Sequence, residues 1–277
     1  MGKIIEVVGL KKIYGDISAV NDVSFYLYRG EIFGFLGPNG AGKTSTINML
    51  VGMAKPTEGK IFYNGEDFTN CIRRAREIIG IVPDDSNLYG EMSGYENLCF
   101  CGALYGMPKK KREPKAKELL DIFQLSDAAN RKFQAYSKGM KRKLTIAAAL
   151  MHDPEILFLD EPTTGIDVAS VRQIRSLIKQ LNKKGATIFL TTHYIEEAER
   201  LCDRVAFINR GSIVTIDTVA QLLENAKESN VLEISFENTP RDKQSMLEKL
   251  CGLSSGCTCG FLNENTIKII SDSKIDV

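Results

Sequence analysis

A glycine-rich octapeptide, GPNGAGKT at residues 37–44, constrains the fold of this chain more than any other feature. It follows the apolar run IFGFL and precedes the helical pattern INMLVGM, so it predicts a strand, a loop and a helix in succession. Such a loop turns its backbone N–H groups inward, and the helix N-terminus adds partial positive charge, so together they favour a phosphate group. A plain glycine-rich turn is the alternative, but it does not account for the flanking strand and helix.

The loop also carries side chains suited to a nucleoside triphosphate. Lys43 would reach the outer phosphates, and the hydroxyl of Thr44 is suited to a nucleotide-bound Mg²⁺. Ser45 places a second hydroxyl beside it. The predicted nucleotide-binding residues of this segment are Gly37, Pro38, Asn39, Gly40, Ala41, Gly42, Lys43, Thr44 and Ser45.

Composition narrows the class of protein further. The chain has 277 residues, of which 43% are hydrophobic and 26% charged, which is typical of a globular protein with one large domain and a small appendage. The 36 basic residues nearly balance the 35 acidic ones, so we expect no nucleic-acid partner. No apolar run approaches the roughly 18 residues that span a bilayer. The N-terminus reads as a charged strand rather than a signal peptide, so we expect a cytoplasmic protein.

The seven cysteines are odd in number and scattered, which favours reduced thiols. The two C-x-C pairs have no nearby histidine to complete a zinc site, and this argues against a structural metal.

Strand and helix patterns alternate along most of the chain. We expect an α/β fold of the P-loop nucleotide-binding kind, with a mixed, mainly parallel sheet covered by helices. A helical pattern interrupts the strands over about residues 85–150 and predicts a helical subdomain within a large domain of residues 1–225. In residues 226–277 a strand pattern, an amphipathic segment and a second strand pattern predict a small α+β appendage.

The segment EILFLDE at residues 155–161 predicts a buried strand that ends in two carboxylates. Asp160 would hold Mg²⁺, and Glu161 would orient or deprotonate an attacking water. By itself the segment could equally be a strand followed by a solvated acidic turn. Beside the phosphate loop, the catalytic interpretation is favoured.

Together with the segment YSKGMKRKL at 136–144, these residues resemble the nucleotide-binding subunit of ABC transporters over about residues 3–225. The segment is similar to the family's LSGGQ signature, with Lys138 in place of a glycine and Met140 in place of the glutamine. The resemblance implies that Ser137 and Gly139 contact the γ-phosphate bound by an opposing subunit, and that the chain serves an exporter. A solvated basic helix start is the alternative interpretation of SKGMKRK.

The resemblance implies three more site residues. Asp167, in TTGID, matches the acid of the family's dimer-contact loop. His193, in TTH, matches the switch histidine that contacts the γ-phosphate and steadies the attacking water, although a lone histidine at a strand end is more often structural. Tyr14 matches the aromatic residue that stacks on adenine, and a tyrosine packed on the core is the alternative.

The chain departs from the family at Asp84, where a glutamine is usual. The glutamine donates a carbonyl oxygen to Mg²⁺, whereas a carboxylate binds the metal more strongly but adds negative charge beside the γ-phosphate. We therefore expect retained binding with altered turnover. Five downstream residues could form either a groove for a partner or the core of the helical insert: Leu88, Tyr89, Met92, Tyr95 and Phe100.

As a whole, the resemblance implies an ATPase that uses ATP and Mg²⁺. It implies two partners, a transmembrane permease and a second ATPase subunit, and a location on the inner face of the cell membrane. A soluble ABC ATPase that acts on a non-membrane partner is the alternative.

Overall fold

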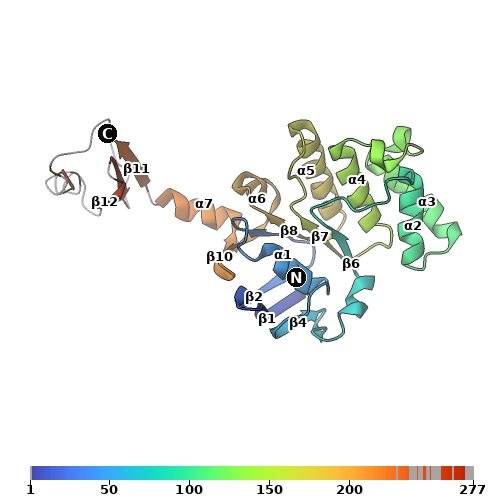
Figure 1. Cartoon of the computed structure of the whole chain (residues 1–277), viewed down its shortest axis with the longest axis horizontal. Coiled ribbons are helices and arrows are strands. Elements are labelled where there is room, and N and C mark those ends of the chain that lie inside the picture. Colours follow the sequence, from blue (N-terminus) through green and yellow to red (C-terminus); the bar gives the residue numbers. More distant parts are fainter. Residues whose placement is uncertain are drawn as a thin grey trace. The chain divides into compact units, whose positions relative to one another are not determined.

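The computed structural model describes residues 2–228, 230–236, 242, 246–247, 250, 257–263 and 265–271. It divides into two compact units, Met1–Asp217 and Thr218–Val277, which are described separately. In the first unit the helices α2, α3 and α4 gather at one end, and the strands β1, β2 and β4 lie below the helix α1 (Figure 1).

A six-stranded sheet forms the centre of the first unit, in the order β10-β9-β3-β8-β7-β6. The pairings from β9 through β3, β8 and β7 to β6 are parallel, which confirms the expected mainly parallel α/β fold. All residues of the three central strands are buried, as expected for a sheet covered on both faces. The strands are β3 (Ile32–Leu36), β6 (Ile79–Val82), β7 (Ile156–Asp160), β8 (Thr187–Thr192), β9 (Arg204–Asn209) and β10 (Ser212–Thr218).

A second, antiparallel sheet has the order β2-β1-β4-β5. The Asn-Gly turn between its last two strands has positive φ at both central residues, Asn64 at 51° and Gly65 at 82°, as tight hairpins require. Phe25 of this sheet stacks on Phe33 of the parallel sheet, with ring centroids 5.5 Å apart, so the two sheets share one core. The strands are β1 (Lys3–Tyr14), β2 (Ile17–Tyr28), β4 (Glu58–Tyr63) and β5 (Glu66–Asp67).

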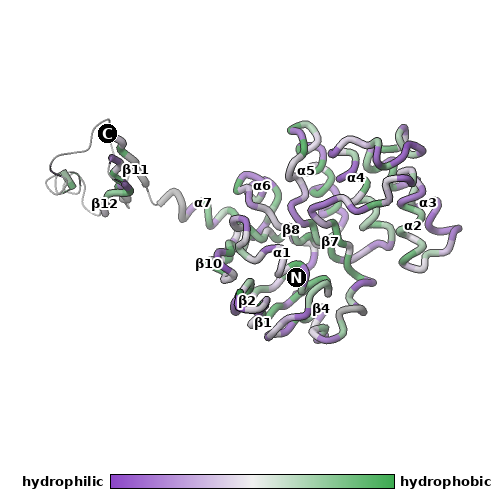
Figure 2. The backbone as a smooth tube through the Cα atoms, in the orientation of Figure 1, coloured by the Kyte–Doolittle hydropathy of each residue, from purple (hydrophilic) through white to green (hydrophobic). Residues whose placement is uncertain are grey.

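The helical insert lies between β6 and β7, which are neighbours in the parallel sheet. Its first helix begins with a capping box, in which Ser93 and Glu96 satisfy each other's backbone N–H groups. The buried strand β7 appears hydrophobic in Figure 2, whereas the lysine-rich α3 is largely hydrophilic. The insert comprises α2 (Gly94–Leu104), α3 (Lys109–Ile122), η2 (Ser126–Ala128), η3 (Phe133–Ala135) and α4 (Lys138–Ala149).

The other helices of the first unit are α1 (Lys43–Leu50), η1 (Ile72–Glu77), α5 (Val168–Lys183) and α6 (Ile195–Leu201). No helix in the described part of the chain is long and apolar enough to cross a membrane.

The second unit contains α7 (Val219–Glu228) and a three-stranded antiparallel sheet, β11-β13-β12. The strands β11 (Asn230–Ser235) and β13 (Thr266–Ser271) correspond to the two predicted strand patterns. The strand β12 (Cys257–Asn263) was not predicted, because Gly260 interrupts its alternation. Most of the amphipathic segment expected at residues 241–252 lies outside the described residues.

Candidate functional site

The phosphate loop connects β3 to α1, as the sequence predicts. Gly42 lies at its end with φ 104°, and a Cβ atom there would approach the carbonyl oxygen of Ala19 to 2.5 Å, so only glycine fits. The Lys43 side chain is 6% exposed, and its ammonium group donates to the carbonyl oxygens of Gly37 and Pro38 at 2.8 and 3.2 Å. The lysine is therefore folded over its own loop.

The loop leaves backbone donors available. The N–H groups of Gly40, Gly42 and Lys43 find no protein acceptor within the described part of the chain. The first N–H groups of a helix have no partner inside the helix, and an anion is well placed to accept from them. The loop therefore fits the phosphates of a nucleotide.

Two neighbouring acids leave β7 in different directions. Asp160 is 7% exposed and accepts a short hydrogen bond from the hydroxyl of Thr191 on β8. Glu161 has φ 46°, an uncommon conformation for a non-glycine residue, and its N–H donates to the backbone oxygen and to the hydroxyl of Thr191. This turn directs the second carboxylate toward the phosphate loop.

The carboxylate of Glu161 is held from three sides. Its Oε1 lies 3.3 Å from the ammonium nitrogen of Lys43, and its Oε2 lies 2.8 Å from Nδ1 of His193. The hydroxyl of Thr164 also donates to Oε2, at 3.0 Å. The Glu161 side chain is only 12% exposed, so an acid, a histidine and the loop lysine share one sheltered site.

A cavity of about 320 Å³ opens at this point. Ala19, on β2, and Thr164 line it without having been predicted. The predicted residues that line it are Asn39, Gly40, Gly42, Lys43, Thr44, Ser45, Asp84, Glu161 and His193. The predicted residues outside its lining are Tyr14, Gly37, Pro38, Ala41, Ser137, Gly139, Asp160 and Asp167.

Asp84 enters the cavity from the loop that follows β6. Partial burial raises the pKa of this carboxyl group; the nearby Arg142 opposes the shift, and Asp160 and Glu161 add to it. The guanidinium of Arg142 lies 3.6 Å from the Asp84 carboxylate, and it also donates to the backbone oxygens of Pro83 and Asp84.

The basic run that follows Ser137 is solvated only at its start, where Lys138 is exposed. Arg142 is 4% exposed and Lys143 is 7% exposed, and burial lowers the pKa of both side chains. The sequence shows only a cluster of positive charges here. The helix α4 packs against α2, β6 and α5, which come from other parts of the chain, and this packing accounts for the burial.

Ser137 caps α4, and its hydroxyl accepts from the N–H of Met140 at 3.2 Å. Asp167 caps α5 by accepting from the N–H of Ser170 at 2.9 Å, and this hydrogen bond lowers the pKa of the Asp167 carboxyl group. A Cβ atom at Gly139 would lie 2.3 Å from the hydroxyl oxygen of Ser170. The N-terminal turns of α4 and α5 therefore pack against each other, which brings the signature and the TTGID segment together.

Tyr14 lies at the end of β1, and the residue is 46% exposed, so it is not packed in the core. The ammonium of Lys12 lies 4.7 Å from the centroid of its ring. The hairpin pairs Lys12 with Val20, the neighbour of the cavity-lining Ala19.

A buried acid behind the site was missed by the sequence interpretation. Glu197 on α6 is fully buried and accepts from the hydroxyl of Thr163 at 2.6 Å, while its Oε2 has no partner within the described structure. An acid in the pattern IEEAER resembles an exposed helix face, so no sequence signal indicated its burial.

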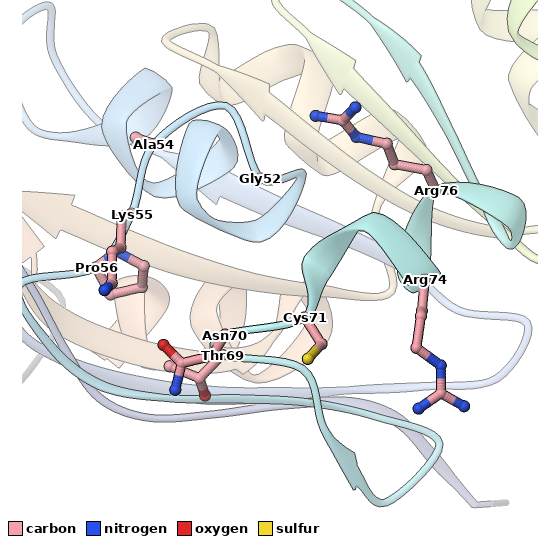
Figure 3. Close-up of a pocket in the computed structure, with 9 residues that line it drawn as sticks. All are labelled: Gly52, Ala54, Lys55, Pro56, Thr69, Asn70, Cys71, Arg74 and Arg76. Carbon is pink, nitrogen blue, oxygen red and sulfur yellow. The ribbon is translucent and has the colours of Figure 1, made fainter.

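A separate cavity of about 670 Å³ lies between the end of α1 and η1, and it contains none of the predicted site residues. Figure 3 shows Arg74 and Arg76 pointing in different directions on η1. The two guanidinium groups do not converge on one point, so they do not form an anion-binding site together.

The side chains available as metal ligands carry hydroxyl and carboxylate oxygens: Thr44, Ser45 and Asp84 line the cavity, and Asp160 lies outside its lining. Oxygen ligands of this kind suit Mg²⁺. Within the described residues, no three histidine, cysteine or acidic side chains form a ready metal site. The residues present therefore fit a Mg²⁺ ion that arrives with the oxygens of a bound nucleotide.

The chain is similar to known ABC transporter proteins. Residues 20–164 match the ABC transporter family. The chain is 41% identical over 226 residues to the linearmycin resistance ATP-binding protein LnrL of Bacillus subtilis, covering 82% of this chain and 73% of LnrL. It is 42% identical over 230 residues to the Nod factor export ATP-binding protein I of Bradyrhizobium diazoefficiens, covering 83% and 75% of the two chains.

Among solved structures, the fold is similar to that of cbiO1 from Clostridium perfringens, described as part of the ABC transporter complex cbiONQ. The TM-score is 0.75 at 27% identity, and the match covers 82% of this chain and 93% of cbiO1. Fold, phosphate loop and sequence relatives agree, and the chain belongs to the ABC transporter family as an ATP-binding subunit that hydrolyses ATP.

Proposed function

We propose that this subunit powers an exporter, and that it hydrolyses ATP with Glu161 as the residue that activates water. The observation that carries the catalytic assignment is the sheltered carboxylate of Glu161, held by Lys43, His193 and Thr164 at the phosphate-loop cavity. Export is supported by two relatives, one that carries Nod factor export in its name and one named for linearmycin resistance.

Each residue around the γ-phosphate has a separate task in this proposal. Lys43 neutralises the outer phosphates, and the free N–H groups of the loop hold their oxygens. Glu161 orients the attacking water and accepts its proton. His193 holds the Glu161 carboxylate through Nδ1, which leaves Nε2 for the γ-phosphate. Charges placed in advance in a sheltered cavity stabilise the developing charge without further reorganisation.

Thr44, Asp160 and Asp84 are the residues that would hold Mg²⁺, with Ser45 beside them. When bound, the ion neutralises charge on the β- and γ-phosphate oxygens. The hydrogen bond from the Thr191 hydroxyl holds the Asp160 carboxylate, so its remaining oxygen lone pairs are oriented before the nucleotide arrives.

The signature completes the site of a second subunit. Ser137, Gly139 and Asp167 lie outside the lining of this chain's own cavity, yet the first two form the N-terminus of a 12-residue helix suited to an anion. We infer a two-fold dimer in which each chain contributes its phosphate loop to one ATP and its signature to the other. Tyr14 offers a half-exposed ring for stacking on adenine.

A permease is the proposed membrane partner and would hold the subunit on the inner face of the membrane. Leu88, Tyr89, Met92, Tyr95 and Phe100 are partly or largely exposed, and Tyr89 and Phe100 make an edge-to-face ring contact at 5.0 Å. None of them is fully buried, which favours the interpretation as a groove for a partner over that of an internal core. We retain residues 226–277 as a separate appendage of unassigned role.

The test is the Glu161→Gln protein in ATP and Mg²⁺. Glutamine keeps the shape of the side chain but accepts no proton, so turnover should fall by at least about 100-fold while ATP binding persists. Bound ATP should then hold two chains together on a sizing column. A monomer under these conditions, both alone and with a membrane partner, would contradict the dimer. Glu199→Gln, on the exposed side of α6, is the matched control and should behave as wild type.

A further inference from the structure

Arg142 connects two parts of the molecule that serve different ATP sites in the proposed dimer. It lies on α4, the helix that begins at the signature, yet it is 4% exposed because its side chain leaves the helix toward the loop after β6. There it donates to the backbone oxygens of Pro83 and Asp84 and lies 3.6 Å from the Asp84 carboxylate. One side chain thus joins the signature helix to the loop that lines this chain's own nucleotide cavity.

The loop has little else to hold it. Among the described residues, the hydrogen bonds made by segment 83–88 are those with Arg142. Asp84, the cavity-lining residue of this segment, has a side chain that is 56% exposed. The position of Asp84 relative to Lys43 and Glu161 therefore depends on where α4 places the guanidinium.

Arginine is suited to this connection. Its planar guanidinium carries several donors in a rigid fork, so it holds two carbonyl oxygens and faces a carboxylate at the same time. The carboxylate that replaces the family's usual glutamine at position 84 adds a charge opposite this cation. A lysine has one ammonium group and cannot reproduce the fork.

We propose that Arg142 is a positioning residue. It couples the contact of the signature with the opposing subunit's ATP to the position of Asp84 in the chain's own active site. When α4 moves to bring Ser137 onto the nucleotide of the opposing subunit, Arg142 moves the Asp84 loop with it. The position of the Asp84 loop in each chain thereby depends on whether the signature of that chain contacts the ATP bound by the opposing subunit. The inference rests on the proposed dimeric ATPase and adds a direct link between its two sites.

The experiment measures steady-state ATP hydrolysis of the full chain with Arg142→Met, Ser137→Ala and both changes together. We expect Arg142→Met to lower kcat at least about tenfold, because the Asp84 loop loses the hydrogen bonds and the positive charge that hold it in place. We expect the double variant to be within about twofold of Ser137→Ala, because the relay has nothing left to transmit once the signature contact is gone. A purely structural defect would instead multiply the two losses.

A second readout separates this inference from the proposed function. With Glu161→Gln added, Arg142→Met should still form the ATP-dependent dimer, with a dimer fraction within about threefold of Glu161→Gln alone. If the Glu161→Gln protein stays monomeric in ATP both by itself and with a membrane partner, the proposed dimer is what fails. If it dimerises but Arg142→Met turns over within about threefold of wild type, or the losses multiply, the relay is wrong.

Two further variants complete the experiment, one as a milder substitution of Arg142 and one as a control elsewhere. Arg142→Lys keeps the charge and should show a smaller loss of kcat with the same dependence on Ser137, should Arg142→Met not fold. Arg76→Met is the matched control, because Arg76 is exposed and makes no ion pair in the described structure. It should leave kcat and KM unchanged, and a loss equal to that of Arg142→Met would contradict the assignment.

Discussion

Nδ1 of His193 lies 2.8 Å from Oε2 of Glu161, so the ring nitrogen nearer the backbone donates to the carboxylate. The Lys43 ammonium holds the other carboxylate oxygen at 3.3 Å. The proposed base is therefore oriented before ATP binds, and in the proposed mechanism the two ring nitrogens of His193 have different tasks, Nδ1 at Glu161 and Nε2 at the γ-phosphate.

Substitutions of His193 separate these two tasks. Asparagine places its amide nitrogen where Nδ1 lies, and glutamine places it where Nε2 lies. If the bond to Glu161 dominates, His193→Asn should retain more activity than His193→Gln, and His193→Ala should lose at least about 100-fold in kcat. ATPase assays with ATP binding as the reference check this order. Tyr194→Phe, beside the same ring, is the control and should retain activity.

Asp84→Gln restores the family's usual residue and tests the effect of the carboxylate. Removing a negative charge next to Asp160 and Glu161 reduces repulsion of the γ-phosphate, so the KM for ATP should fall. A neutral amide ligates Mg²⁺ more weakly than a carboxylate, so half-maximal activity should need about threefold to tenfold more Mg²⁺. Titrations of ATP and Mg²⁺ measure both effects. Unchanged values in both titrations would show that the substitution is neutral.

Gly139→Ala tests the packing of the signature. The added Cβ atom would lie 2.3 Å from the Ser170 hydroxyl oxygen and 2.6 Å from its Cβ atom, so α4 and α5 must separate. With Glu161→Gln as background, ATP-dependent dimerisation should be lost. Adding Ser170→Gly removes both colliding atoms and keeps the N–H that caps on Asp167, so it should restore the dimer. Failure of this rescue, with both proteins folded, would contradict the packing explanation.

The features visible in the sequence are the local ones. The phosphate loop and the acids at the end of β7 could be predicted, because each is defined by a few consecutive residues. Their positions follow from the point at which a strand ends and a loop begins. Arg142 and Glu197 could not be recognised, because neighbouring charges suggest a solvated helix and their burial comes from distant elements. The strand β12 was missed because the segment CTCGFLN lacks a regular alternation. The resemblance gave His193 and Glu161 each a role at the attacking water, but their direct contact was not predicted, because 32 positions separate them in the chain.

Outside the site, His152 predicts a pH effect on stability. Its ring stacks on Tyr105 with centroids 3.6 Å apart, its Nε2 donates to the Ile79 carbonyl oxygen at 3.0 Å, and its buried Nδ1 has no partner in the described structure. Burial lowers the pKa of His152, opposed by the Ile79 carbonyl and by Asp153, so the folded chain holds the neutral ring.

The unfolded chain binds a proton at this histidine near pH about 6.5, whereas the folded chain binds it only at lower pH. The stabilisation from the neutral ring is therefore complete above the unfolded pKa of about 6.5. It is lost as the pH falls through the pKa of the folded chain, and the free energy of unfolding then falls by less than about 1.4 kcal/mol per pH unit. His152→Gln keeps a donor for Ile79 but does not titrate. The free energy of unfolding of wild type, measured in denaturant at pH 7.5 and 5.5, should fall more than that of His152→Gln. Parallel pH profiles would show that the buried ring titrates as it does in the unfolded chain.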